Sequence, residues 1–241
     1  GVRGITNGID VGLWNPESDP YLPAHYSISD LSGKQTCKRA VQRELGLPDR
    51  DVPLLALIGR MTTQKGFDML LEIIPELALL DLQIVMLGTG DRHMEQQFLT
   101  ARSGHPDRIA VHIGFEEGLA HRIEAGADML VMPSRYEPCG LSQLNSLRYG
   151  TVPIVRRTGG LADTIVPFKP STAQTKLATG FHVVDSSADA LLAGILLALS
   201  VYRNRDAWHA LIQAGMNTDV SWTQAAQRYV QLYRSVIATE E

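Results

Sequence analysis

Cysteine is scarce in this sequence, and charge of one sign does not accumulate in it. The two cysteines, Cys37 and Cys139, are far apart and lack a C-x-x-C spacing, which excludes a disulfide framework and a zinc ribbon. The formal net charge is -4 and no long basic run occurs, which argues against nucleic acid and anionic membranes as partners. This composition is typical of a protein that works in a reducing cytosol or a plastid-like interior.

Long apolar runs are also absent. No stretch reaches the roughly 18 apolar residues of a membrane span, and the longest apolar region, 190–201, is bounded by polar residues and is expected to be a core helix. An initiator Met and a signal-peptide pattern are lacking as well, so we expect a fragment of a longer protein. The chain has 241 residues, 44% of them hydrophobic, and can bury a substantial core; we predict a single domain over residues 1–241.

Short apolar runs alternate with helical patterns along the chain. After a strand-like opening at 2–9, the runs predict strands at 54–59, 82–87, 109–113, 129–132, 152–155 and 181–184. The helical patterns predict helices at 32–45, 66–80, 91–101, 120–124 and 140–149, a short one after residue 160, and three more at 187–203, 205–216 and 222–237. Such alternation indicates parallel βαβ units with right-handed crossovers. The predicted fold class is therefore α/β, with a Rossmann-like doubly wound parallel sheet.

The loop after the predicted strand 129–132 carries a single carboxylate. Glu137 lies between Tyr136 and Pro138, and Gly140 opens the next helical pattern. In an open parallel sheet, ligands bind at the carboxyl ends of the strands, and a helix N-terminus offers free N–H groups to an anion. An ordinary strand-to-helix connection explains the same pattern, so this loop alone leaves both interpretations open.

Two more loops that follow predicted strands carry residues suited to an anion. Arg60 and Lys65 follow the strand at 54–59; arginine offers a planar fork to phosphate oxygens, and lysine offers a point charge. Thr158-Gly159-Gly160 follows the strand at 152–155, and paired glycines allow backbone N–H groups to form an anion-binding concavity. Solvated cations and simple turn chemistry are the plainer explanations. Three such loops at one edge of a sheet nevertheless predict a diphosphate site.

The sequence offers no credible metal site. The histidines lack ligand spacing, and the pair Asp49 and Asp51 precedes a predicted strand, which puts it at the wrong edge of the sheet. Phe115, after the strand at 109–113, is suited either to stacking on a base or to the core. We therefore predict that no metal and no other cofactor is required.

Several motifs occur in the order and spacing of one known family. Arg-Met-Thr-Thr-Gln-Lys-Gly at 60–66, Arg-Tyr-Glu-Pro-Cys-Gly-Leu at 135–141 and Arg-Arg-Thr-Gly-Gly-Leu at 156–161 resemble bacterial glycogen synthases and plant starch synthases. Ile-Thr-Asn-Gly-Ile-Asp at 5–10 matches too, so the resemblance covers essentially the whole chain. It implies the C-terminal half of a GT-B retaining glycosyltransferase, which passes glucose from ADP-glucose to the non-reducing 4-hydroxyl of an α-1,4-glucan.

The resemblance also assigns roles to individual residues. It implies that Arg60 and Lys65 neutralise the departing nucleotide diphosphate, and that Glu137 is the essential acidic residue beside the donor glucose. The nature of that carboxylate's role, as nucleophile, electrostatic stabiliser or positioner of sugar hydroxyls, is left open. The remaining donor-binding and cleft positions are Gly140, Leu141, Ser142, Thr158, Gly159, Gly160, Phe115 for the adenine, and Asn7 near the interdomain cleft.

One position departs from the pattern of related retaining transferases. They place a second Glu eight positions after the first, and here that position is Asn145. The departure weakens the expected ribose contact but not the resemblance.

The resemblance implies further partners and a location. The expected partners are ADP or ADP-glucose, a glycogen or starch acceptor, and the N-terminal domain of the same enzyme. The C-terminal helix within 221–241 has an apolar stripe that is most simply packed on this domain, though it could reach that other one. The expected location is a bacterial cytoplasm or a plastid stroma. As an isolated chain the protein is expected to bind nucleotide without turnover; the alternative is a GT-B transferase of the sucrose- or trehalose-phosphate-synthase kind.

Overall fold

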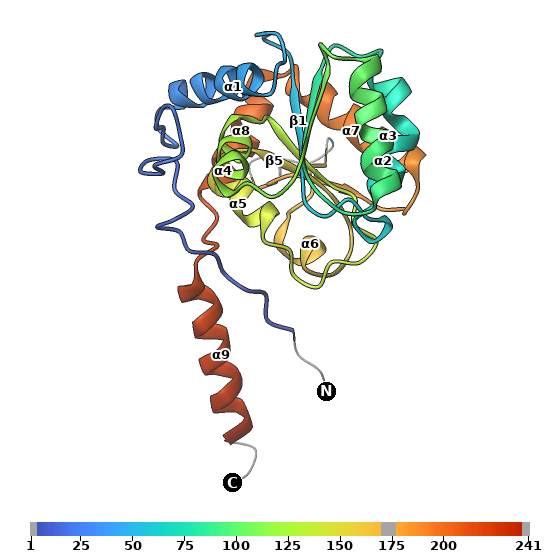
Figure 1. Ribbon diagram of the computed structural model, residues 1–241. Helices are drawn as coiled ribbons and strands as arrows, with labels where there is room; N and C mark the ends of the chain where they lie inside the picture. The colour runs from blue at the N-terminus through green and yellow to red at the C-terminus, as the bar shows by residue number, and fades with distance from the viewer. Residues whose placement is uncertain (1–3, 170–176, 238–241) are drawn as a thin grey trace.

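Six parallel strands form one sheet in the order β3-β2-β1-β4-β5-β6 (Figure 1). The structure is a computed structural model that describes residues 4–169 and 177–237. The strands are β1 (Leu54–Ile58), β2 (Gln83–Gly88), β3 (Ile109–Ile113), β4 (Met129–Met132), β5 (Val152–Arg156) and β6 (Phe181–Val183). The chain adds strands on one side of β1 and then on the other, so the topological switch point lies between β1 and β4. The predicted doubly wound parallel sheet is confirmed.

Helices cover both faces of the sheet (Figure 1). They are α1 (Ser32–Glu44), α2 (Phe67–Leu77), α3 (Arg92–Gly104), α4 (Glu117–Gly126), α5 (Ser142–Arg148), α6 (Gly159–Thr164), α7 (Ala188–Tyr202), α8 (Arg205–Met216) and α9 (Trp222–Ile237), with a short 3-10 turn η1 (Thr63–Lys65) before α2. In β1, Leu55 and Leu57 join the core on one face, and Leu54 and Ala56 join the core on the other. Burial on both faces explains why the strands are continuous apolar runs in the sequence. No helix in the described ranges is long and apolar enough to cross a membrane.

Helix ends shift by a few residues, as in α4, which spans Glu117–Gly126 where 120–124 was predicted, and two further differences bear on the argument. The expected strand at 2–9 is not formed in its described part, because Ile9 makes only an isolated bridge with Ser221 and finds no neighbouring strand; residues 2 and 3 lie outside the described residues. The helix expected from residue 140 begins at Ser142, because Gly140 takes a left-handed conformation with φ of +74°. This shortens α5 and lengthens the loop that holds Glu137.

Helix α9 extends away from the rest of the fold (Figure 1). Ala225 is its one buried residue and Tyr229 and Leu232 are partly buried, whereas most of its large apolar side chains are exposed: Trp222, Val230, Tyr233, Val236 and Ile237. The prediction that this stripe packs on the same domain is therefore wrong, because little of the helix touches that domain. The last residues of the predicted segment, 238–241, lie outside the described residues.

A buried lysine ties α1 to the amino-terminal edge of the sheet. The Lys34 ammonium donates to the carbonyl oxygens of Ala125 and Tyr149 at 2.9 Å each and to the Thr151 hydroxyl at 2.8 Å. The Tyr26 hydroxyl donates to the same two carbonyls, at 3.2 and 2.8 Å. Burial lowers the pKa of Lys34 from its usual value of 10.5 to about 8, although nearby acidic groups, Asp128 first among them, oppose the shift.

The lowered pKa of Lys34 predicts a stability that changes with pH. Between pH 8 and 10 a lysine in the unfolded chain stays protonated while folded Lys34 loses its proton, so the unfolding free energy rises with pH through this group. We expect the unfolding free energy of the wild type to rise, relative to Lys34→Met, by roughly 1 kcal/mol per pH unit over this range. Urea titrations at several pH values measure the difference. Gln35→Met on the same helix serves as the control, and a pH-independent difference for Lys34→Met would contradict the assignment.

Candidate functional site

A cavity of about 340 Å³ lies at the carboxyl ends of β1 and β4, at the topological switch point. Its walls come from the loop after β1 and from the loop that joins β4 to α5. The predicted site residues that line it are Arg60, Lys65, Glu137, Gly140, Leu141 and Ser142. The structure thus brings together six residues from two separate segments of the sequence, 60–65 and 137–142.

An ion pair forms the centre of this cavity. Glu137 is only 7% exposed, and the ammonium of Lys65 donates to its Oε2 atom. The hydroxyl of Ser134 donates to the same oxygen at 3.2 Å, and Ser134 is itself buried. The buried carboxylate therefore has both a counter-charge and a second donor, which is what a buried charge needs. Ser134 was not predicted as a site residue, because nothing in its local sequence pattern marks it as a partner of Glu137.

Arg60 has a different environment from Lys65. Its side chain is exposed at the cavity wall, and it has no ion-pair partner within the ranges that the structure describes. The site therefore holds one cation that is already paired with a carboxylate and one that is available to an incoming anion.

The cavity also borders the start of α5. Gly140 has a left-handed backbone, which glycine adopts without strain, and Leu141 precedes the helix without a side-chain cap. Both residues and Ser142 line the cavity. Asn145, where related enzymes have a second carboxylate, is buried and does not line the cavity; its Oδ1 atom has no hydrogen-bond partner among the described residues.

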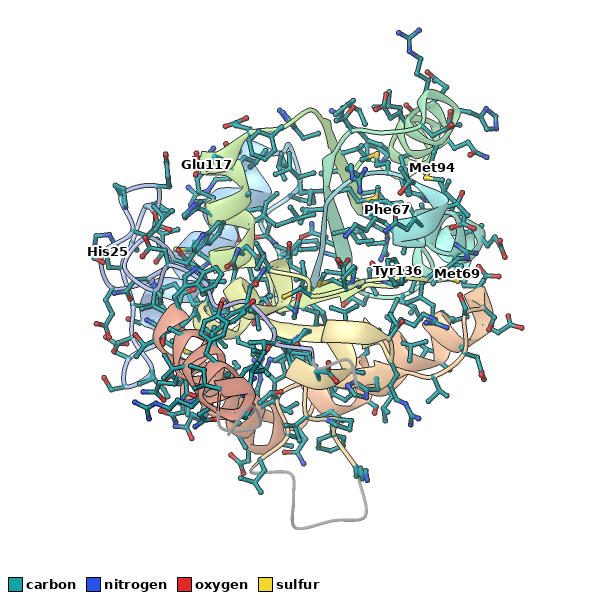
Figure 2. All side chains as sticks on the ribbon, turned by 90° about the horizontal axis from the view of Figure 1, so that it is seen from below. His25, Phe67, Met69, Met94, Glu117 and Tyr136 are labelled. Atoms are coloured by element: carbon teal, nitrogen blue, oxygen red, sulfur yellow. The ribbon has the colours of Figure 1, made fainter. Side chains whose placement is uncertain are left out.

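The loops after β1 and β4 are joined to each other through Arg135. Its guanidinium donates to both carboxylate oxygens of Asp68, at 2.7 and 2.8 Å, and to the Thr63 carbonyl oxygen at 2.6 Å. Figure 2 labels Tyr136 from the second loop and Phe67 and Met69 from α2, which lie toward the same side of the molecule. Arg135 belongs to one of the predicted motifs, but the sequence pattern gives no role to it or to Asp68.

The predicted glycine loop supports the Glu137 loop from outside the cavity. The N–H of Gly160 donates to the Glu137 carbonyl oxygen at 3.0 Å. A Cβ added to Gly159 would lie 2.1 Å from that oxygen, and one added to Gly160 would lie 2.2 Å from the Cys139 carbonyl oxygen. Thr158, Gly159 and Gly160 do not line the cavity, so their contact with a donor stays a prediction.

The last two predicted residues also lie outside the cavity. The N–H of Asn7 donates to the Cys139 sulfur at 3.4 Å, which places Asn7 beside the Glu137 loop. Phe115 is 89% exposed at the end of β3, which rules out the core as its role. Its stacking on a base, and a cleft role for Asn7, stay predictions.

Comparisons with known proteins agree with this architecture. The chain is 52% identical over 98% of its length to a glycogen synthase from Anaeromyxobacter sp., and it spans about half (49%) of that relative. Among solved structures, the catalytic domain of starch synthase IV from Arabidopsis thaliana, bound to ADP and acarbose, superposes with a TM-score of 0.88 at 32% identity. That match covers 96% of this chain and 48% of the starch synthase chain. The predicted resemblance to glycogen and starch synthases is confirmed.

A third comparison shows the fold alone. The C-terminal domain of a glycosyl transferase group 1 family protein from Francisella tularensis matches with a TM-score of 0.61 at 18% identity. The match covers 87% of this chain and 95% of that domain. Residues 38–215 match the family described as glycosyl transferases group 1. The chain therefore belongs to the glycosyl transferases group 1 family and has the fold of one half of a GT-B enzyme.

Proposed function

We propose that this chain is the donor-binding part of an enzyme that transfers glucose from ADP-glucose to the non-reducing 4-hydroxyl of an α-1,4-glucan, with retention of configuration. The observation that carries the proposal is the cavity at the ends of β1 and β4, where Lys65 contacts the buried Glu137 and Arg60 lines the same wall. The relative solved with ADP and acarbose supports a nucleotide and a glucan as ligands.

The charges in the cavity suit the breaking of a glycosyl–phosphate bond. Cleavage builds positive charge on the sugar and negative charge on the departing diphosphate. Fixed cations and helix N–H groups that already point at the phosphate stabilise this charge separation without reorganising. In the proposed complex Arg60, Lys65 and the start of α5 surround the diphosphate, and the two cations supply the positive charge without a metal ion.

Lys65 links the two parts of the donor site. An ammonium has three N–H donors, and in the structure the interaction with Glu137 occupies one of them. We therefore propose that Lys65 contacts Glu137 and a phosphate oxygen at the same time, which holds Glu137 next to the bond that breaks. The carboxylate then faces the donor glucose as nucleophile, electrostatic stabiliser or positioner of sugar hydroxyls.

The acceptor site and full catalysis require a second half in this proposal. The chain spans about half of the relatives it matches, and α9 exposes an apolar stripe that little of the domain covers. We propose that α9 and the edge near Asn7 pack against an N-terminal domain, and that closure of the two domains completes the site. The isolated chain would then bind nucleotide without turning over substrate.

A GT-B transferase with another donor is the alternative, of the sucrose- or trehalose-phosphate-synthase kind. Calorimetric titration of the chain with ADP and then UDP, in buffer containing EDTA, separates the two. Saturable binding of ADP with weak binding of UDP supports the proposed donor. Preference for UDP favours the alternative, and dependence on added metal contradicts the proposed metal-free phosphate site.

The diphosphate assignment predicts a selective loss of binding. We expect Arg60→Ala and Lys65→Ala each to weaken ADP binding by about tenfold or more, because each removes a charge-assisted contact to phosphate, while adenosine binding stays unchanged. Arg43→Ala, on the exposed side of α1, removes the same charge away from the cavity and serves as the control. Equal losses for ADP and adenosine would overturn the assignment.

The role of Glu137 predicts loss of turnover without loss of folding. We expect Glu137→Gln to abolish glucose transfer in a chimera that carries the first half of the Anaeromyxobacter sp. relative before this chain, because the uncharged amide provides neither the nucleophile nor the negative charge. The variant should still fold, because the amide keeps the shape of the side chain, but its unfolding temperature should be lower than that of the parent chimera, because Lys65 loses its ion-pair partner. Glu76→Gln on the exposed side of α2 is the control; a Glu137→Gln chimera with parental activity would exclude a catalytic role.

A further inference from the structure

Arg135 lies where the two loops of the cavity meet. It comes two positions before Glu137, and its side-chain contacts, Thr63 and Asp68, lie on either side of Lys65 in the chain. The backbone adds to this junction, because the N–H of Arg135 donates to the Gln64 carbonyl oxygen at 2.8 Å. One side chain therefore spans the distance between the segments that carry the two charged groups of the central ion pair.

We propose that Arg135, held by Asp68, is a positioning residue that sets the separation of Lys65 from Glu137 and so keeps Lys65 in place for a diphosphate. The inference rests on the proposed function. It concerns residues that touch neither phosphate nor sugar in that proposal, because the bonds from Arg135 are directed at Asp68 and Thr63.

The geometry of the Arg135–Asp68 pair favours a positioning role over that of an ordinary surface ion pair. The side chains of Arg135 and Asp68 are 36% and 29% exposed, and pairs at this level of exposure add little to global stability. The contacts are nevertheless bidentate, with a third bond to a backbone carbonyl, and this arrangement requires the planar fork of an arginine. A lysine keeps the charge but cannot make the same set of bonds.

The backbone next to Arg135 limits how far the two loops can move relative to each other. A Cβ added to Gly66 would lie 2.2 Å from the Pro133 carbonyl oxygen, so the segments are already in backbone contact next to Arg135. Asp68 is in the first turn of α2, where a carboxylate is favoured by the helix dipole. The anchor for Arg135 is thus part of a helix that packs in the core and not part of a free loop.

The test combines binding with local exchange. We expect Arg135→Lys and Asp68→Asn each to weaken binding of inorganic pyrophosphate and of ADP by about tenfold, because each substitution displaces Lys65 slightly from the phosphate. Adenosine binding should stay unchanged. Backbone amides in residues 62–66 and 134–139 should exchange with deuterium faster in both variants. The double variant should bind no more weakly than either single one, because both substitutions break the same contact.

A second bidentate pair in the chain provides the matched control. Arg122 donates to both carboxylate oxygens of Glu44, at 2.7 and 2.6 Å, and joins α4 to α1 away from the cavity. Glu44→Gln should lower the unfolding temperature about as much as Asp68→Asn does, with no change in pyrophosphate affinity or in exchange at the two loops.

Three results would overturn the inference. The first is wild-type pyrophosphate affinity in Asp68→Asn. The second is wild-type pyrophosphate affinity in Arg135→Lys, which would show that charge alone matters. The third is unchanged deuterium exchange of the backbone amides in the two loops. A wild-type chain that binds neither ADP nor pyrophosphate would instead contradict the proposed function. In that case the exchange measurement still decides whether Arg135 orders the two loops.

Discussion

The burial of Glu137 is the constraint on which the rest of the site depends. A carboxylate at 7% exposure needs a counter-charge and hydrogen-bond donors, because an unpaired buried charge costs several kcal/mol. Lys65 supplies the charge and Ser134 a donor. Lys65 can do so only if the loop after β1 lies against the loop after β4. The strand order places β1 beside β4, so the topology itself brings the two loops together at the switch point.

Close backbone packing restricts the positions that these two loops can take. Gly66 lies against the carbonyl of Pro133, and Gly159 and Gly160 lie against the carbonyls of Glu137 and Cys139, at distances that no Cβ would permit. The segment from 133 to 139 is therefore held from two sides by backbone. Side-chain pairs then adjust what the backbone has already restricted, so a pair as exposed as Arg135 and Asp68 can influence geometry more than stability.

The sequence predicted the sheet well because its strands are buried on both faces and so appear as uninterrupted apolar runs. The segment at 4–9 has strand-like residues too, but strands need a neighbour, and this segment finds only a single bridge. The polar residues that follow β1 and β4 could be placed at one edge, because parallel strands end together. The partners Ser134 and Asp68 could not be found, because contacts between loops depend on distances that no local pattern encodes. The apolar stripe of α9 is likewise visible in the sequence, but the sequence pattern does not show which surface that stripe packs against.

The two cations of the cavity differ in a way that separates binding from chemistry. Arg60 has no acidic partner among the described residues, so an anion can approach it without breaking an ion pair. Lys65 already compensates Glu137, and its remaining N–H donors can reach a phosphate oxygen without breaking that contact. In the proposed enzyme both cations therefore bind the diphosphate, Arg60 as a cation with no ion-pair partner among the described residues and Lys65 while it stays paired with Glu137. Lys65 contributes a different effect: it keeps the carboxylate compensated in the empty site and couples it to the phosphate once a donor is bound. The position of Lys65 relative to Glu137 thus matters in addition to the two positive charges of the cavity.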